Sequence, residues 1–173
     1  MTDLDSIKIR AAAADNANRA AELLYSTARP LFEFVYGADR GFMLAMLAAQ
    51  WRAEESLFSH RHAVGAYNDA GELIGLELGF GNQDEAAIFA GSRAVARALA
   101  SAAQQTVIAE AVRQLTYFAP HTPDGSYCVH HLAVDPRAGV KGLGRRLLQD
   151  AFERQAAAGY GVVCLDVLDN NPA

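Results

Sequence analysis

Residues 139–145 combine glycines with basic side chains in a pattern suited to binding phosphate. Gly142 and Gly144 lack the Cβ atoms that would hold a ligand away from the main chain, and glycine reaches backbone conformations that other residues avoid. Apolar residues then recur at helical spacing, which predicts a helix over 142–158. A helix N-terminus offers unpaired N–H groups and a partial positive charge, which suit a pyrophosphate. The segment therefore predicts a phosphate-binding turn built mainly from main-chain groups.

The elements on either side of this helix must hold the turn in place. The apolar run 127–134 predicts a strand before the turn, and 161–168 predicts a second strand after the helix. Gly159 is suited to ending the helix between them. A strand, a crossover helix and a second strand imply parallel pairing with a right-handed connection.

The N-terminal part of the chain predicts further strands and helices of an α/β domain. We expect a strand over 6–10, then a helix capped by Asp15 that ends at the Arg29-Pro30 step. The other expected elements are a helical region over 31–51 broken near Gly37 and Gly41, a β-hairpin formed by 60–67 and 73–80, and an 82–124 insertion with helices over 85–100 and 105–118. The hairpin and the parallel pair together predict a mixed sheet flanked by helices, in one domain spanning 1–173.

Composition and charge restrict the class of protein. The chain has 173 residues, 51% of them hydrophobic, so it can form a core without disulfides. Cys128 and Cys164 lie in apolar runs and are expected to be reduced core residues. A formal net charge of −5 argues against nucleic acid as a partner. No secretory signal and no membrane-spanning apolar run is found, so we expect a cytoplasmic protein that does not bind membranes.

The C-terminal third resembles the GNAT superfamily of acetyl-CoA-dependent N-acetyltransferases. The family signature is a strand ending in Leu-Ala-Val-x-Pro, then Arg/Gln-x-x-Gly-x-Gly/Ala opening a helix, then a strand ending near Asn-x-x-Ala. The corresponding pieces of this chain, in the same order, are Leu132-Ala133-Val134-Asp135-Pro136, Gly139-Val140-Lys141-Gly142-Leu143-Gly144 and Asn170-Asn171-Pro172-Ala173. The resemblance implies a GNAT-like mixed sheet and transfer of an acetyl group to a primary amine of a small molecule or peptide.

The resemblance also implies which residues bind acetyl-CoA. The main chain of Leu132, Ala133 and Val134 would pair with the pantetheine arm, and Asn170 would lie near the thioester. No metal is implied. The pyrophosphate would be held by Gly139, Val140, Lys141, Gly142, Leu143, Gly144 and Arg145.

The chain departs from the family pattern at two places. Gly139 replaces the usual Arg or Gln, and Arg137 lies two residues earlier, so a side-chain contact is lost while the main-chain cradle is kept. The chain stops at Ala173, where family members continue with a helix carrying a tyrosine that often protonates the leaving thiolate, and then a β-hairpin. The chain is therefore either truncated at its C-terminal end, which we expect, or a partial family member whose missing layer leaves apolar surface exposed.

Acetyl transfer to an amine needs a base, because an ammonium must lose a proton before it can attack. Strand alternation places His130 on the same face as Leu132 and Val134, and histidine titrates near neutral pH, so His130 is the first candidate base. Glu77 is the second candidate, although an exposed carboxylate on the hairpin is the simpler interpretation. Either histidine or carboxylate could instead have a structural role.

Several alternatives stay open at this point. His60 and His62, with His130 or His131, could be imagined as a metal site, but their spacing argues against one. An aromatic group could line an acceptor pocket or form core: Phe32, Phe34, Tyr36, Phe42 and Trp51. The inserted helices could form a wall of that pocket or the surface of a homodimer.

Two other functions compete with the transferase. A non-catalytic acyl-CoA-binding sensor or interaction module would keep the phosphate turn without the chemistry. A nucleotide-binding fold would need an acidic ribose-binding residue about twenty positions after the turn, where Asp166 lies, but the hairpin and the Asn-x-x-Ala ending fit that fold poorly.

Overall fold

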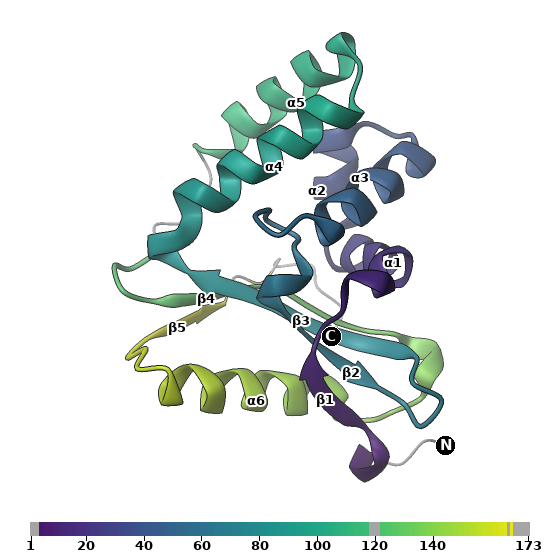
Figure 1. The fold of residues 1–173 in the computed structure, drawn as a ribbon, viewed down its shortest axis with the longest axis vertical. Coiled ribbons are helices and arrows are strands. Elements are labelled where there is room, and N and C mark those ends of the chain that lie inside the picture. The colour runs from purple at the N-terminus through teal and green to yellow at the C-terminus, as the bar shows by residue number, and fades with distance from the viewer. Residues whose placement is uncertain (1–3, 118–121, 166, 168–173) are drawn as a thin grey trace.

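The fold is a mixed five-stranded sheet with helices on both faces (Figure 1). A computed structural model describes residues 4–117, 122–165 and 167. The strands lie in chain order across the sheet, and every neighbouring pair is antiparallel except the last, which is parallel. They are β1 (Lys8–Ala11), β2 (Ala63–Tyr67), β3 (Leu73–Gly81), β4 (Tyr127–Val134) and β5 (Val163–Leu165). The predicted α/β class, hairpin and parallel pair are confirmed.

Three helices cover one face of the sheet and α6 (Leu143–Ala157) covers the other (Figure 1). The three are α1 (Ala17–Thr27), α2 (Arg29–Tyr36) and α3 (Arg40–Arg52). The predicted cap at Asp15 is wrong, because this residue lies inside a 3₁₀ turn that precedes α1. The predicted break at Gly41 is also wrong, because this residue lies in the first turn of α3. Asp39 caps that helix, and its side chain accepts a hydrogen bond from the N–H of Phe42.

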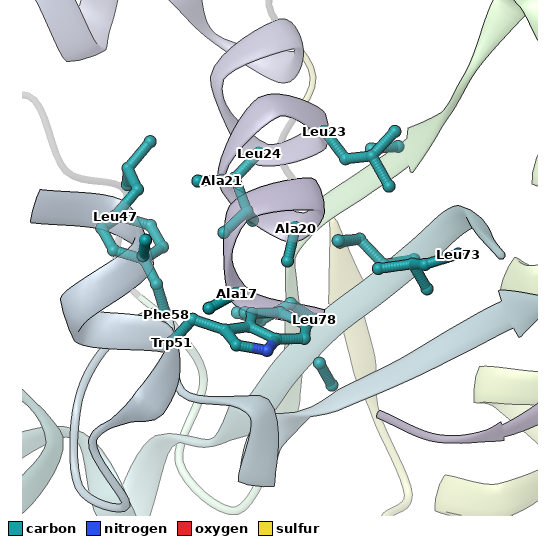
Figure 2. Close-up of a cluster of buried hydrophobic side chains, with 14 of the residues drawn as sticks. Ala17, Ala20, Ala21, Leu23, Leu24, Leu47, Trp51, Phe58, Leu73 and Leu78 are labelled. Atoms are coloured by element: carbon teal, nitrogen blue, oxygen red, sulfur yellow. The ribbon is translucent and has the colours of Figure 1, made fainter. Parts of the chain in front are cut away.

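The main core lies between α1, α3 and the sheet (Figure 2). Alanines on α1 let the helix approach β3 closely, while Trp51 fills the space beside them and is fully buried. The indole N–H of Trp51 donates to the carbonyl of Ala13 at 2.9 Å, so its polar atom is satisfied. Of the predicted aromatic group, Phe32 and Trp51 are therefore core residues, whereas Phe34 is exposed.

Two helices between β3 and β4 form a hairpin that projects beyond the sheet (Figure 1). They are α4 (Glu85–Leu99) and α5 (Ala102–Leu115), as the 82–124 segment predicts. A Cβ atom at Gly91 of α4 would collide with the carbonyl oxygen of Glu55, and the next residue, Ser92, accepts a hydrogen bond from the N–H of Leu57 at 2.7 Å. The hairpin is thus anchored by main-chain contact with the segment after α3.

Candidate functional site

In the loop between β4 and α6, Gly142 takes an unusual backbone conformation as predicted, whereas Gly144 lies inside α6 without a positive φ. A 3₁₀ turn over Pro136–Ala138 is capped by Asp135, whose carboxylate accepts from the N–H of Arg137 at 2.9 Å. Gly139 and Gly142 then take left-handed conformations, with φ of 64° and 79°. The left-handed conformation at position 139 favours glycine, which explains why Gly139 stands where the family has Arg or Gln.

Main-chain N–H groups at the start of α6 are left without helical partners. The first helical bond there runs from the N–H of Arg146 to the carbonyl of Gly142, so the N–H groups of Leu143, Gly144 and Arg145 have no acceptor within the helix. The side chains of Val140 and Leu143 are buried in a small apolar cluster that includes Leu147. This packing fixes the loop from below and leaves its N–H groups available to an anion.

The basic side chains around the loop differ in whether they are exposed or bound to another part of the chain. Lys141 and Arg145 are exposed. Arg146 is instead bound, because its guanidinium donates to the carbonyl of Leu4 in the N-terminal 3₁₀ turn. The turn at Leu4–Ser6 therefore lies beside the first turn of α6. The local positive charge expected at this end of the helix is supplied by Lys141, Arg145 and the helix itself.

Asp135 is a buried residue at the start of the loop that the sequence reasoning did not single out. Its carboxylate accepts from the guanidinium groups of Arg137 and of Arg19 on α1, and Arg19 also donates to the carbonyl of Leu73 at 3.0 Å. The hydrogen bond from Arg137 and the contact with Arg19 lower the pKa of Asp135 to about 2. The buried carboxylate thus ties the loop to α1 and β3. An acidic residue directly after a strand and before proline was the available signal.

The second part of the site is the edge of β4 that faces β5. Among the residues that the structure describes, β5 pairs only with Tyr127, Cys128 and Val129. β4 continues to Val134, so within the described part of the chain its main chain from 130 to 134 has no strand partner on that side. The side chains of Leu132 and Val134 pack under α6, and Ala133 packs in the main core. The predicted cofactor residues of β4 can therefore contribute their main chain only.

A β-bulge in β4 overturns the predicted orientation of His130. Leu78 pairs with His131 and Gly79 with Val129, which leaves His130 as an extra residue in the strand. The alternation shifts there, and His130 stacks on Phe80 at 4.2 Å between ring centroids, on the face opposite to Leu132. A Cβ atom at Gly79 would collide with the carbonyl of Cys128, so the glycine accommodates the bulge.

Glu77 is buried, contrary to the expectation of an exposed carboxylate. Its side chain has 0% exposure. One carboxylate oxygen accepts from the hydroxyl of Tyr127 at 2.9 Å and the other from Arg154 of α6 at 2.7 Å. Arg154 also binds Asp150 at 2.6 Å. Burial raises the pKa of Glu77, and the bonds from Arg154 and Tyr127 oppose that rise.

The remaining predicted residues are of two kinds: two that the structure does not describe, and two histidines in a turn before β2. Asn170 and Asp166 lie outside the described residues. His60 and His62 lie in a 3₁₀ turn before β2, where His60 Nδ1 lies 2.8 Å from the carbonyl of Trp51. The described residues contain no group of three or more histidine, cysteine, aspartate and glutamate side chains placed to hold a metal ion.

The chain was compared with families, curated proteins and solved structures. No family model and no curated protein matches the sequence. A solved acetyltransferase is 19% identical with a TM-score of 0.71, over 95% of this chain and 82% of the other. An N-acetyltransferase from Staphylococcus aureus Mu50 is 16% identical with a TM-score of 0.62, over 85% of this chain and 75% of the other. The chain has the GNAT fold.

This GNAT fold is the one that the signature residues imply. A third similar structure is the PaiA N-acetyltransferase of Thermoplasma acidophilum in complex with coenzyme A, 15% identical with a TM-score of 0.52, over 96% of this chain and 82% of the other. At these identities the likeness establishes the fold, so the predicted fold class is confirmed and the resemblance to the GNAT superfamily is confirmed as a shared fold. In the described part of the chain, no helix is long and apolar enough to cross a membrane.

Proposed function

We propose that the chain is an N-acetyltransferase that moves an acetyl group from acetyl-CoA to a primary amine of a small molecule or peptide. The observation that carries the proposal is the loop at 139–145, where two left-handed glycines precede main-chain N–H groups that lack helical acceptors. Such a helix start binds a diphosphate without needing a particular side chain. Beside it, the edge of β4 beyond Val129 pairs with no described residue of β5, and its main-chain groups suit an extended arm such as pantetheine.

The reaction requires that the two substrates meet near the bulge. The amine nitrogen attacks the thioester carbonyl carbon, and the carbon–sulfur bond breaks. The amine loses one proton, and the CoA thiolate that leaves gains one to become the thiol. His130 is the proposed base, because it lies at the bulge, next to Val129, the last residue of β4 that pairs with a described residue of β5. Glu77 fits a structural role better, since Arg154 and Tyr127 occupy both of its oxygens.

A non-catalytic acyl-CoA-binding module is the second candidate function. The enclosure of Glu77 favours it, because one of the two candidate bases is already committed to an ion pair inside the fold. The module would use the same loop and the same strand edge to bind acyl-CoA, and binding would be followed by no thiol release.

Titration calorimetry with acetyl-CoA, CoA and NAD tests the shared part of both functions. Binding of both CoA species and not of NAD is expected, and failure to bind either CoA species would reject both functions. A thiol-release assay with acetyl-CoA and a panel of tyramine, spermidine and a lysine-containing peptide then separates them. Thiol release supports the transferase, and tight binding without release for any amine supports the binding module.

A matched pair of glycine variants tests whether the loop is the binding site. Gly142 and Gly159 flank the same helix with φ of 79° and 92°, so replacing either with alanine imposes a similar backbone strain of about 1 kcal/mol. Gly142→Ala is expected to raise the Kd for CoA about 10-fold, because the loop amides shift away from the diphosphate. Gly159→Ala should leave the Kd unchanged, and equal effects of the two variants would contradict the assignment.

A further inference from the structure

A histidine that the sequence reasoning did not choose lies at the junction of α1, α2 and β4. His131 follows the bulge residue, and its imidazole is half-buried. Its Nδ1 atom lies 2.8 Å from the hydroxyl oxygen of Thr27, the last residue of α1. The two residues are 104 positions apart in the chain, so the contact belongs to the tertiary structure.

The hydrogen bonds of Thr27 decide which nitrogen of His131 carries the proton. The Thr27 hydroxyl lies 2.7 Å from the carbonyl oxygen of Leu24, and a carbonyl can only accept. The single hydroxyl proton is used there, so the hydroxyl oxygen must accept from Nδ1–H of His131. The neutral imidazole then has its lone pair on Nε2.

Aromatic rings hold the imidazole plane in place. Phe32 of α2 stacks on it at 5.7 Å between centroids, with an interplanar angle of 22°. Phe58 packs at 5.4 Å and 54°. With Nδ1 directed at α1, Nε2 is directed away from that helix, and it forms no hydrogen bond with the residues that the structure describes. Burial, with a smaller contribution from His130, lowers the pKa of His131 to about 3, so the ring stays neutral near pH 7.

We propose that Thr27 and His131 form an acceptor-positioning pair, in which Thr27 fixes the Nδ1–H tautomer and Nε2 of His131 accepts a hydrogen bond from an N–H of the amine. The inference rests on the proposed transferase function. The pair would favour acceptors that present an N–H group. His131 takes no part in proton transfer in this proposal. His131 directly follows the bulge, on the stretch of β4 that pairs with no described residue of β5.

Two variants separate this role from simple packing. Thr27→Val has nearly the same shape but cannot accept from Nδ1–H, whereas Thr27→Ser keeps the hydroxyl. Thr27→Val is expected to raise the KM for the amine about 5-fold, the effect of one hydrogen bond, with the KM for acetyl-CoA unchanged. Thr27→Ser should restore the wild-type value. An unchanged amine KM in Thr27→Val would overturn the inference.

Nitrogen-15 spectra of histidine-labelled protein give a readout that packing alone would not change. The wild-type His131 should show a protonated Nδ1 and an unprotonated Nε2, and Thr27→Val should show a mixture of tautomers. With CoA bound to prevent turnover, adding tyramine, spermidine or the lysine peptide should shift the His131 Nε2 signal for whichever amine is acetylated. A wild-type Nδ1 without a proton, or an Nε2 signal that no amine in the panel moves, would overturn the inference.

Calorimetry on the same samples distinguishes failure of the positioning pair from failure of the proposed transferase function. Thr27→Val should bind CoA as tightly as wild type, because Thr27 lies outside the phosphate loop. If both proteins bind CoA and the amine readouts are unaffected, the positioning pair is rejected and the transferase stands. If wild type binds no CoA, the proposed function fails and the inference fails with it.

Discussion

The two ends of α6 differ in how their polar groups are satisfied. At the C-terminal end, Arg154 joins Glu77 and Asp150, and the N–H groups of Gly159 and Tyr160 bond to carbonyls of the last helical turn. At the N-terminal end, the first-turn N–H groups have no helical acceptor. Both ends carry a left-handed glycine, so backbone conformation alone does not mark a site. The two ends differ in that only the N-terminal end has main-chain N–H groups without a helical acceptor.

The largest expected effect, on the free energy of unfolding, comes from removing the ion pair at the C-terminal end of α6. Arg154→Leu leaves the Glu77 carboxylate buried without its cation and should lower the free energy of unfolding at pH 7 by about 3 kcal/mol. Urea unfolding measures this. The deficit should shrink as the pH falls towards 5, because burial raises the pKa of Glu77 and a protonated Glu77 needs no cation. A deficit that stays constant over this pH range would show that Glu77 is not the group left uncompensated.

A smaller effect, on binding and not on stability, is expected at the open end. Arg145 is exposed at the start of the same helix, so Arg145→Leu should change the free energy of unfolding by less than about 0.5 kcal/mol. It should weaken CoA binding about 5-fold through loss of one charge near the phosphates. Calorimetry and urea unfolding on this variant and on Arg154→Leu should give opposite patterns. If Arg145→Leu were the less stable of the two, the contrast between the ends would be wrong.

The smallest effect concerns the carboxylate beneath the loop. The pKa of Asp135 is lowered to about 2, so its contribution to stability is present above its ordinary pKa and is lost as the pH falls from about 4 towards 2. Asp135→Asn removes that contribution. The stability difference between wild type and Asp135→Asn should therefore be larger at pH 5 than at pH 2.5, as measured by urea unfolding. Equal differences at the two pH values would mean that the ion pairs with Arg19 and Arg137 do not hold the loop.

Local sequence was enough to predict the loop and most elements around it. Gly142, Gly159 and the helical apolar pattern between them report on conformation within a few residues, whereas the left-handed conformation of Gly139 was not predicted. The strand over Tyr127–Val134 was predicted with its observed bounds, because an apolar run between turn residues has one simple interpretation.

Contacts between distant segments were the part that the sequence could not supply. One extra residue at the bulge reverses the alternation that placed His130, and a pattern of apolar residues does not reveal it; only Gly79, opposite the bulge, was a signal. Glu77 is bound by Arg154, 77 positions later. A lone carboxylate within the apolar strand Leu73–Gly81 could have indicated burial with a partner, since an exposed hairpin face would carry more polar residues.

The close approach of Gly91 to the carbonyl of Glu55 has an evolutionary consequence. Even one methyl group at this position would push α4 off the segment after α3, whereas most of the surface of α4 and α5 is free to vary. When relatives of this chain are aligned, those that keep the helical hairpin in this position should therefore keep glycine here. A relative with a larger residue at this position should hold its hairpin at a different angle, or have lost it.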